Sequence, residues 1–115
     1  MRAAARGQDY HISFGGKTQM HFASDVAQQF IAAAEQPLDG AFAFNLGTTP
    51  VSMGEVAALI MTYVPNVRIT HGETPLPFAE GTDGSALYRA FPAHIYKTPL
   101  AEGIRQTLEA FARLG

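Results

Sequence analysis

The sequence has no cysteine and no long apolar run. Without cysteine, disulfides, thiolate metal ligands and cysteine nucleophiles are excluded. This composition suits a reducing compartment, so we expect a cytoplasmic protein. No apolar stretch approaches the roughly 20 residues that span a bilayer, and polar residues follow Met1–Arg6 where a signal peptide would have its apolar core. We therefore expect no membrane as a partner.

Charged residues are also scarce. They make up 16% of the sequence, against about 25% in an average soluble domain, which suggests that some apolar surface is meant for a partner. The eight Lys and Arg residues are scattered and the net charge is −2, so the basic surface that nucleic-acid binding requires is absent. A length of 115 residues fits one domain, 1–115.

The N-terminal residues Met1–Arg6 are helix formers, and Gly7 is a stop signal. No capping residue precedes them, and an isolated helix this short cannot offset its nucleation cost. We expect the last turns of a helix in a chain cut from a longer one, with a frayed terminus as the alternative.

A hairpin is predicted next. Tyr10–Phe14 and Thr18–Phe22 alternate apolar and polar residues on either side of Gly15-Gly16. His11 and His21 would then lie on facing strands. Because no spacing supplies further metal ligands or a carboxylate partner, we interpret both as surface or hydrogen-bonded histidines.

A helix is predicted from the capping pair Ser24-Asp25 to about Glu35, and Asp25 is interpreted as its N-cap. The expected apolar face consists of Val26, Phe30, Ile31 and Ala34. The run Ala41–Leu46 is nearly all apolar, as in a strand covered on both faces of an α/β sheet. Asn45, at its carboxyl end, could contact a ligand or form a turn.

The second half begins with a capping box. Ser52 and Glu55 open a helix that continues until Pro65, and a strand follows at Val67–His71. The segment Gly72–Gly84 is a loop of the length that serves as a binding lid or is disordered.

Two further helices are predicted after this loop. The group Asp83-Gly84-Ser85 is predicted to cap a short helix through Leu87 and Tyr88. Thr98 caps a final helix in which Pro99 takes the first position.

The order of these motifs resembles the C-terminal part of the extended short-chain dehydrogenase/reductases, the NAD-dependent epimerase/dehydratase family. The matching residues are Phe14-Gly15-Gly16, Ser24-Asp25-Val26-Ala27, Phe44-Asn45-Leu46-Gly47, Val51-Ser52 with Glu55-Val56, Asp83, and Thr98-Pro99-Leu100 with Glu102-Gly103-Ile104. They extend over nearly the whole chain.

The resemblance implies an α/β fold with a small mixed sheet and covering helices, the substrate-binding portion of such an enzyme without its Rossmann core. Its Gly-rich turn and Tyr-x-x-x-Lys pair are missing here, so we expect no catalytic, cofactor-binding or metal-binding residues in this chain. NAD or NADP would be bound by an upstream domain, the chain's expected partner together with a second copy of itself. The alternative is a non-catalytic binding or assembly module that keeps the fold.

The resemblance also implies substrate contacts at Thr18, Gln19, Met20, Asn45 and Asp83. Family members that bind nucleotide sugars usually carry Arg near two of these positions, where the guanidinium binds the diphosphate. This sequence has Thr18-Gln19 and Glu80 there instead. A sugar-like or carbonyl substrate that is smaller, uncharged or differently anchored is therefore as compatible as a nucleotide-diphosphate sugar.

Overall fold

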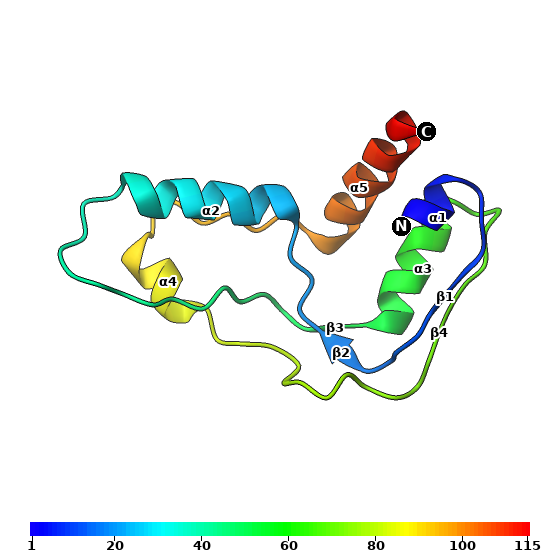
Figure 1. The fold of residues 1–115 in the computed structure, drawn as a ribbon, viewed down its shortest axis with the longest axis horizontal. Helices are drawn as coiled ribbons and strands as arrows, with labels where there is room; N and C mark the ends of the chain where they lie inside the picture. The colour runs from blue at the N-terminus through cyan, green and yellow to red at the C-terminus, as the bar shows by residue number, and fades with distance from the viewer.

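The computed structural model describes residues 1–115 as a mixed α/β structure with five helices and four short strands (Figure 1). The elements are, in chain order, α1 (Arg2–Ala5), β1 (Tyr10–Ile12), β2 (Lys17–Thr18), α2 (Ala23–Glu35), β3 (Val51–Ser52), α3 (Met53–Tyr63), β4 (Ile69–His71), α4 (Ser85–Ala90) and α5 (Leu100–Leu114). The predicted α/β class is confirmed.

The strands form two separate pairs instead of one mixed sheet. β1 pairs in parallel with β4, with Tyr10 opposite Ile69, and β2 pairs antiparallel with β3. The predicted hairpin is therefore wrong. At Gly15 the chain runs alongside the loop after β4, where its amide N–H donates to the Thr74 carbonyl at 2.9 Å. Period-two alternation predicts a strand but not its partner, and here both partners are remote in sequence.

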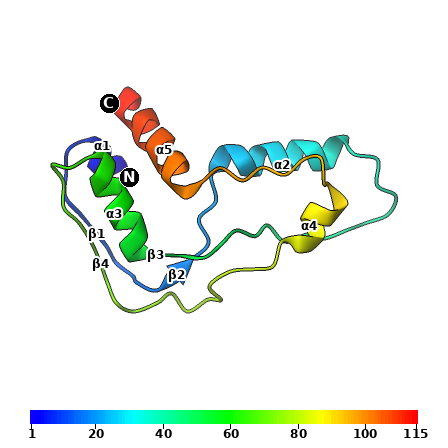
Figure 2. The ribbon, with the colours of Figure 1, turned by 180° about the vertical axis from the view of Figure 1, so that it is seen from behind.

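The main core lies where α1, α3, β4 and α5 meet. Its buried side chains include Val56 and Ile60 of α3, Ile69 of β4, and Ile104 and Leu108 of α5. Val56 and Ile60, like Ile104 and Leu108, are four residues apart, a spacing that puts each pair on one face of its helix. Both figures show this group at one end of the molecule, with α2 and α4 at the other (Figures 1 and 2).

Helix starts agree with the sequence in part. The Ser52 hydroxyl accepts a hydrogen bond from the Glu55 amide at 3.1 Å, which confirms it as the N-cap of α3. The Asp83 carboxylate accepts from the Ser85 amide at 2.9 Å at the start of α4. The predicted cap at Thr98 is wrong, because Pro99 is the N-cap residue of α5 and the Thr98 hydroxyl donates elsewhere.

Helix α2 differs from its prediction. Its buried residues are Gln29 and Ala32, whereas Phe30 and Ile31 are 69% and 57% exposed. Two apolar side chains thus point away from the chain's own interior. The sequence pattern located an apolar surface on α2, but nothing within these residues covers it.

The segment Ala41–Leu46 is not a strand. It has no strand partner, and Phe42 is 61% exposed. The Phe42 and Phe44 rings stack on each other at a centroid distance of 6.1 Å, and Phe44 meets Phe91 edge-on. The sequence has the composition of a strand buried on both faces, but the sheet that would pair with it is not formed by this chain.

The molecule is flat and extended. It measures 51 × 33 × 17 Å, and its radius of gyration is 16.3 Å, against roughly 13 Å for a compact domain of this length. Its accessible surface, 7546 Å², is about a quarter larger than the roughly 6,100 Å² typical of a folded monomer of this mass. Much surface that a compact domain would bury is therefore open.

Candidate functional site

A cavity of about 260 Å³ lies between α2, α4, the segment Leu46–Val51 and the segment Tyr96–Leu100. Half of its 16 lining residues are hydrophobic. Its polar lining residues are His21, Asp25, Gln29, Thr48, Thr49, Tyr88, Lys97 and Thr98. We refer to it as the α2–α4 cavity.

Asp25 fixes one end of the α2–α4 cavity. Its carboxylate accepts two hydrogen bonds from Thr98, one from the amide N–H at 2.6 Å and one from the hydroxyl at 2.7 Å. The predicted N-cap role of Asp25 is wrong, because α2 has no side-chain cap. Residues at a helix start can cap it or bond to another segment, and here the bond joins α2 to the residues before α5.

Gln29 is the buried polar residue of the cavity wall. It is 4% exposed, and its Nε2 atom is buried without a hydrogen-bond partner. A buried donor left without a partner costs about 1–3 kcal/mol, so such groups are rare unless a water or ligand bonds them. The cavity wall therefore contains one hydrogen-bond donor, the Gln29 side-chain nitrogen, that has no acceptor within this chain.

Tyr88 and Lys97 lie together at the cavity. The Tyr88 hydroxyl donates to the Gly47 carbonyl at 2.8 Å, and the Lys97 Nζ lies 4.1 Å from the centre of the Tyr88 ring. Burial, followed by the nearby negative charge of Asp25, raises the pKa of Tyr88 above its usual value of 10.0. The hydroxyl is therefore a proton-bearing donor at neutral pH, and the ammonium is held over the ring face.

Gln19 connects two segments near the cavity. Its Nε2 donates to the carbonyls of Thr48 and Thr82 at 2.6 and 2.9 Å, and its Oε1 accepts from the Thr82 amide at 3.0 Å. The same two segments cross at Gly47 and Gly84. A Cβ added at Gly47 would lie 2.6 Å from the Gly84 amide nitrogen, so the crossing requires glycine. One end of the loop that follows β4 is thereby fixed.

Of the five predicted substrate-binding residues, Gln19, Asn45 and Asp83 belong to segments that meet at the Gly47–Gly84 crossing, which lies beside the cavity and not in it. Met20 lines the α2–α4 cavity, whereas Thr18 belongs to the β2–β3 pair and Gln19 is engaged by Thr48 and Thr82. Asn45 is exposed, and Asp83 bonds to the Ser85 amide, a bond that lowers the pKa of Asp83. Their substrate contacts stay a prediction.

Sequence reasoning missed Gln29, Tyr88 and Lys97 as cavity residues. The sequence did contain an indication for Gln29. It follows Val26 by three residues and so lies on the same helix face, where a polar residue is unexpected. His21 also lines the cavity, whereas His11 bonds to Thr70 of β4 at 2.7 Å. The two histidines therefore do not face each other, contrary to the predicted hairpin.

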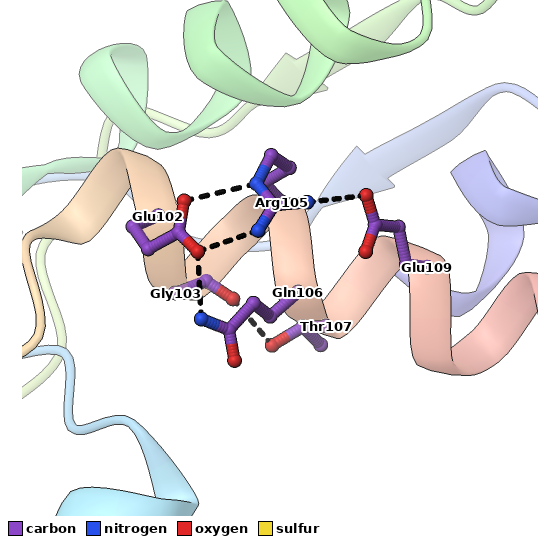
Figure 3. A network of polar contacts seen from close by, with 6 residues as sticks. All are labelled: Glu102, Gly103, Arg105, Gln106, Thr107 and Glu109. Atoms are coloured by element: carbon purple, nitrogen blue, oxygen red, sulfur yellow. Dashed lines mark hydrogen bonds and ion pairs between the residues drawn. The ribbon is translucent and has the colours of Figure 1, made fainter.

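Helix α5 carries a separate polar network (Figure 3). Arg105 donates to Glu102 and Glu109, and Gln106 also donates to Glu102. These hydrogen bonds, those from Arg105 first, lower the pKa of Glu102 from 4.5 to about 2. All of these side chains lie along one helix and outside the cavity lining, so we assign the network to helix stability.

Solved structures with a similar fold are known. The chain superposes on a partial-consensus L-threonine 3-dehydrogenase with a TM-score of 0.76 and 20% identity, over 96% of this chain and 39% of that one. The chain therefore has the fold of part of this dehydrogenase. Two structures of a GalE-like L-threonine dehydrogenase from Cupriavidus necator give similar results. The apo form has a TM-score of 0.71, 18% identity and 97% coverage, and the holo form has 0.69, 19% and 96%.

The resemblance seen in the sequence is confirmed at the level of the fold. The chain spans 38–42% of the length of these dehydrogenases. No family model and no curated protein matches the sequence. None of the helices has both the length and the apolar character needed to cross a membrane, and no group of His, Asp or Glu side chains could hold a metal ion.

Proposed function

We propose that this chain is the substrate-binding part of an NAD(P)-dependent dehydrogenase or epimerase of the cytoplasm, whose cofactor is bound by a domain outside these residues. The observation that carries the proposal is the superposition of 96% of the chain on 39% of an L-threonine 3-dehydrogenase. The segment Ala41–Leu46 supports it from within the chain. Its apolar residues are suited to a strand that extends the cofactor domain's parallel sheet.

The residues of this chain do not fit a dinucleotide. A pyrophosphate is usually bound at a strand, Gly-rich turn and helix, where free amide groups meet the phosphates. The strand β3 does lead directly into α3, but Ser52 stands at the junction and its hydroxyl accepts from the Glu55 amide. We therefore assign no step of cofactor chemistry to these residues.

The open surface supports a docking role. Phe42 and the α2 residues Phe30 and Ile31 are exposed, and the total surface exceeds that of a compact monomer. An interface that buries about 800 Å² per partner is of standard size, and the excess is sufficient for one. A cofactor domain that pairs with Ala41–Leu46 and covers the α2–α4 cavity would enclose the substrate between the two domains.

Two measurements test this function. Calorimetric titration of the 115-residue chain with NAD and NADP is expected to give no saturable micromolar binding. The polypeptide encoded by the intact gene is expected to continue upstream into a strand, a Gly-rich turn and a helix, and to bind one of the two cofactors. If it acts as a dehydrogenase, it should then reduce that cofactor in the presence of a hydroxylated substrate, for which L-threonine is the first trial because it is the substrate named for the similar structures.

The outcomes separate this function from its alternative. Saturable NAD or NADP binding by the 115 residues alone would contradict the assignment of the cofactor to another domain. A gene product that has no cofactor-binding segment, and whose assembly depends on Phe42, would instead favour a non-catalytic binding or assembly module that keeps the fold.

A further inference from the structure

We propose that the α2–α4 cavity binds a small monocarboxylate with an apolar body, held by Lys97 and Gln29. This inference deepens the proposed function and rests on it in one respect, that the bound molecule is a substrate. The binding itself depends only on residues of this chain.

The cavity volume limits the ligand size. It measures about 260 Å³, slightly below the range of roughly 300–1,000 Å³ typical of small-molecule pockets. That space corresponds to roughly nine waters at about 30 Å³ each. A carboxylic acid with about eight non-hydrogen atoms fits this space, whereas a nucleotide sugar is several times too large.

The lining explains why the body should be apolar. Half of the lining residues are hydrophobic, and they include Phe22 and Val26 near α2 and Leu100 at the start of α5. Contacts with these side chains favour a hydrocarbon body, since apolar surface removed from water contributes roughly 25 cal/mol per Å².

Two groups are suited to the carboxylate. Lys97 is exposed and its ammonium lies over the Tyr88 ring, but it takes part in neither of the structure's ion pairs, both of which belong to Arg105. Its charge is therefore not neutralised by a carboxylate of this chain and can attract an anion. The Gln29 side-chain nitrogen lacks a partner, and rotation of its terminal amide allows it to donate to a ligand oxygen. An ammonium and an amide donor together match the acceptor-only character of a carboxylate.

Asp25 explains why one carboxylate is expected and not two. It lines the same cavity, and both of its oxygens already accept hydrogen bonds from Thr98. Its negative charge would repel a second ligand carboxylate, because like charges that close are disfavoured in a partly desolvated site.

The test compares three probes of equal chain length by calorimetry on the protein without cofactor, namely hexanoate, hexanamide and hexylamine. Hexanoate is expected to bind saturably, about tenfold more tightly than hexanamide, because a hydrogen bond to a charged group is the stronger one. Hexylamine is expected to bind more weakly than hexanoate, because it places a cation beside Lys97 while the Asp25 carboxylate is already hydrogen-bonded by Thr98.

Substitutions in the cavity sharpen the test. Lys97→Met should weaken hexanoate binding about tenfold and leave hexanamide unchanged. Gln29→Leu should weaken both probes, yet raise the melting temperature, because it removes a buried donor that has no partner. Lys17→Met and Gln28→Leu are matched controls outside the cavity lining and should leave binding unchanged.

Each outcome decides the proposal. No saturable hexanoate binding, equal binding of hexanoate and hexanamide, or an unchanged affinity in Lys97→Met would overturn the ligand class. The proposed function fails separately, if hexanoate binds as expected and the intact gene product shows no NAD(P)-linked activity. Retained NAD(P)-linked activity without hexanoate binding would overturn only the present inference.

Discussion

Asp25 and Thr98 are 73 residues apart in sequence, and both oxygens of the Asp25 carboxylate accept hydrogen bonds from Thr98. The pair joins the first turn of α2 to the residue before Pro99, the N-cap of α5. It thereby links the two ends of the molecule, since α5 packs in the main core and α2 lies outside it.

Asp25→Ala is expected to lower the free energy of unfolding by about 2 kcal/mol, because hydrogen bonds to a charged group are lost and Thr98 is left without an acceptor. Urea unfolding followed by circular dichroism measures this. Thr98→Val removes only the hydroxyl bond and should cost about half as much. If Thr98→Val had no effect while Asp25→Ala remained costly, a local role of Asp25 in α2 would be the better explanation.

Gly47→Ala is expected to lower the free energy of unfolding by about 1–3 kcal/mol, because the crowded crossing with Gly84 leaves no room for a methyl group. Gly54→Ala in α3 is the matched control. Its added Cβ would lie 3.5 Å from the His71 ring, an ordinary contact, so the better helix former should stabilise the protein by up to about 1 kcal/mol. Thermal melts of both variants check this, and equal effects would show that the crossing can relax.

The lowered pKa of Glu102 predicts that the free energy of unfolding depends on pH in the acid range. Its pKa falls from 4.5 in the unfolded chain to about 2 in the fold, so its contribution is fully present above pH 4.5 and is lost as the pH falls through about 2. In Glu102→Gln, stability should therefore decline less steeply over this range. Urea unfolding at several pH values from 2 to 6 measures the slope. Equal slopes in the variant and the wild type would show that the Arg105 contacts are not maintained in solution.

The exposed segment Ala41–Leu46 predicts self-association of the isolated chain, through an unpaired apolar edge that recruits a second copy or the cofactor domain. Sedimentation velocity at micromolar concentration should show dimers or larger species. Phe42→Ser should shift the distribution toward monomer, whereas Phe78→Ser, at an exposed residue of the loop that follows β4, should not. A monomer with a sharp, cooperative melt would contradict the prediction.

The sequence predicted those features whose causes are local. Ser52 was predicted to open α3, and it caps that helix through an amide only three residues away. It failed where the partner is distant. The strand at Tyr10 pairs 59 positions away with Ile69, and the sequence around it carries no sign of that choice.

The cavity was harder to predict for the same reason. Gln29 and Lys97 come from segments that meet only in the fold, and neither belongs to a recognisable motif. Asp25 shows the reverse error, because its position before a helical pattern favoured a local cap while its actual partner, Thr98, lies in another segment. A capping rule predicts the partner of such a residue correctly only when the amide that it bonds lies in the adjoining helix.

The shortest dimension of the molecule, 17 Å, is not much more than the roughly 10–12 Å diameter of one helix with its side chains. In so thin a molecule α2 has a side that no other element of this chain covers. Substitutions of Phe30 and Ile31 on that side of α2 would then affect contacts with a neighbouring domain and not the stability of this chain alone. Substitutions there should be nearly silent in melts of the isolated chain and costly in the assembled protein.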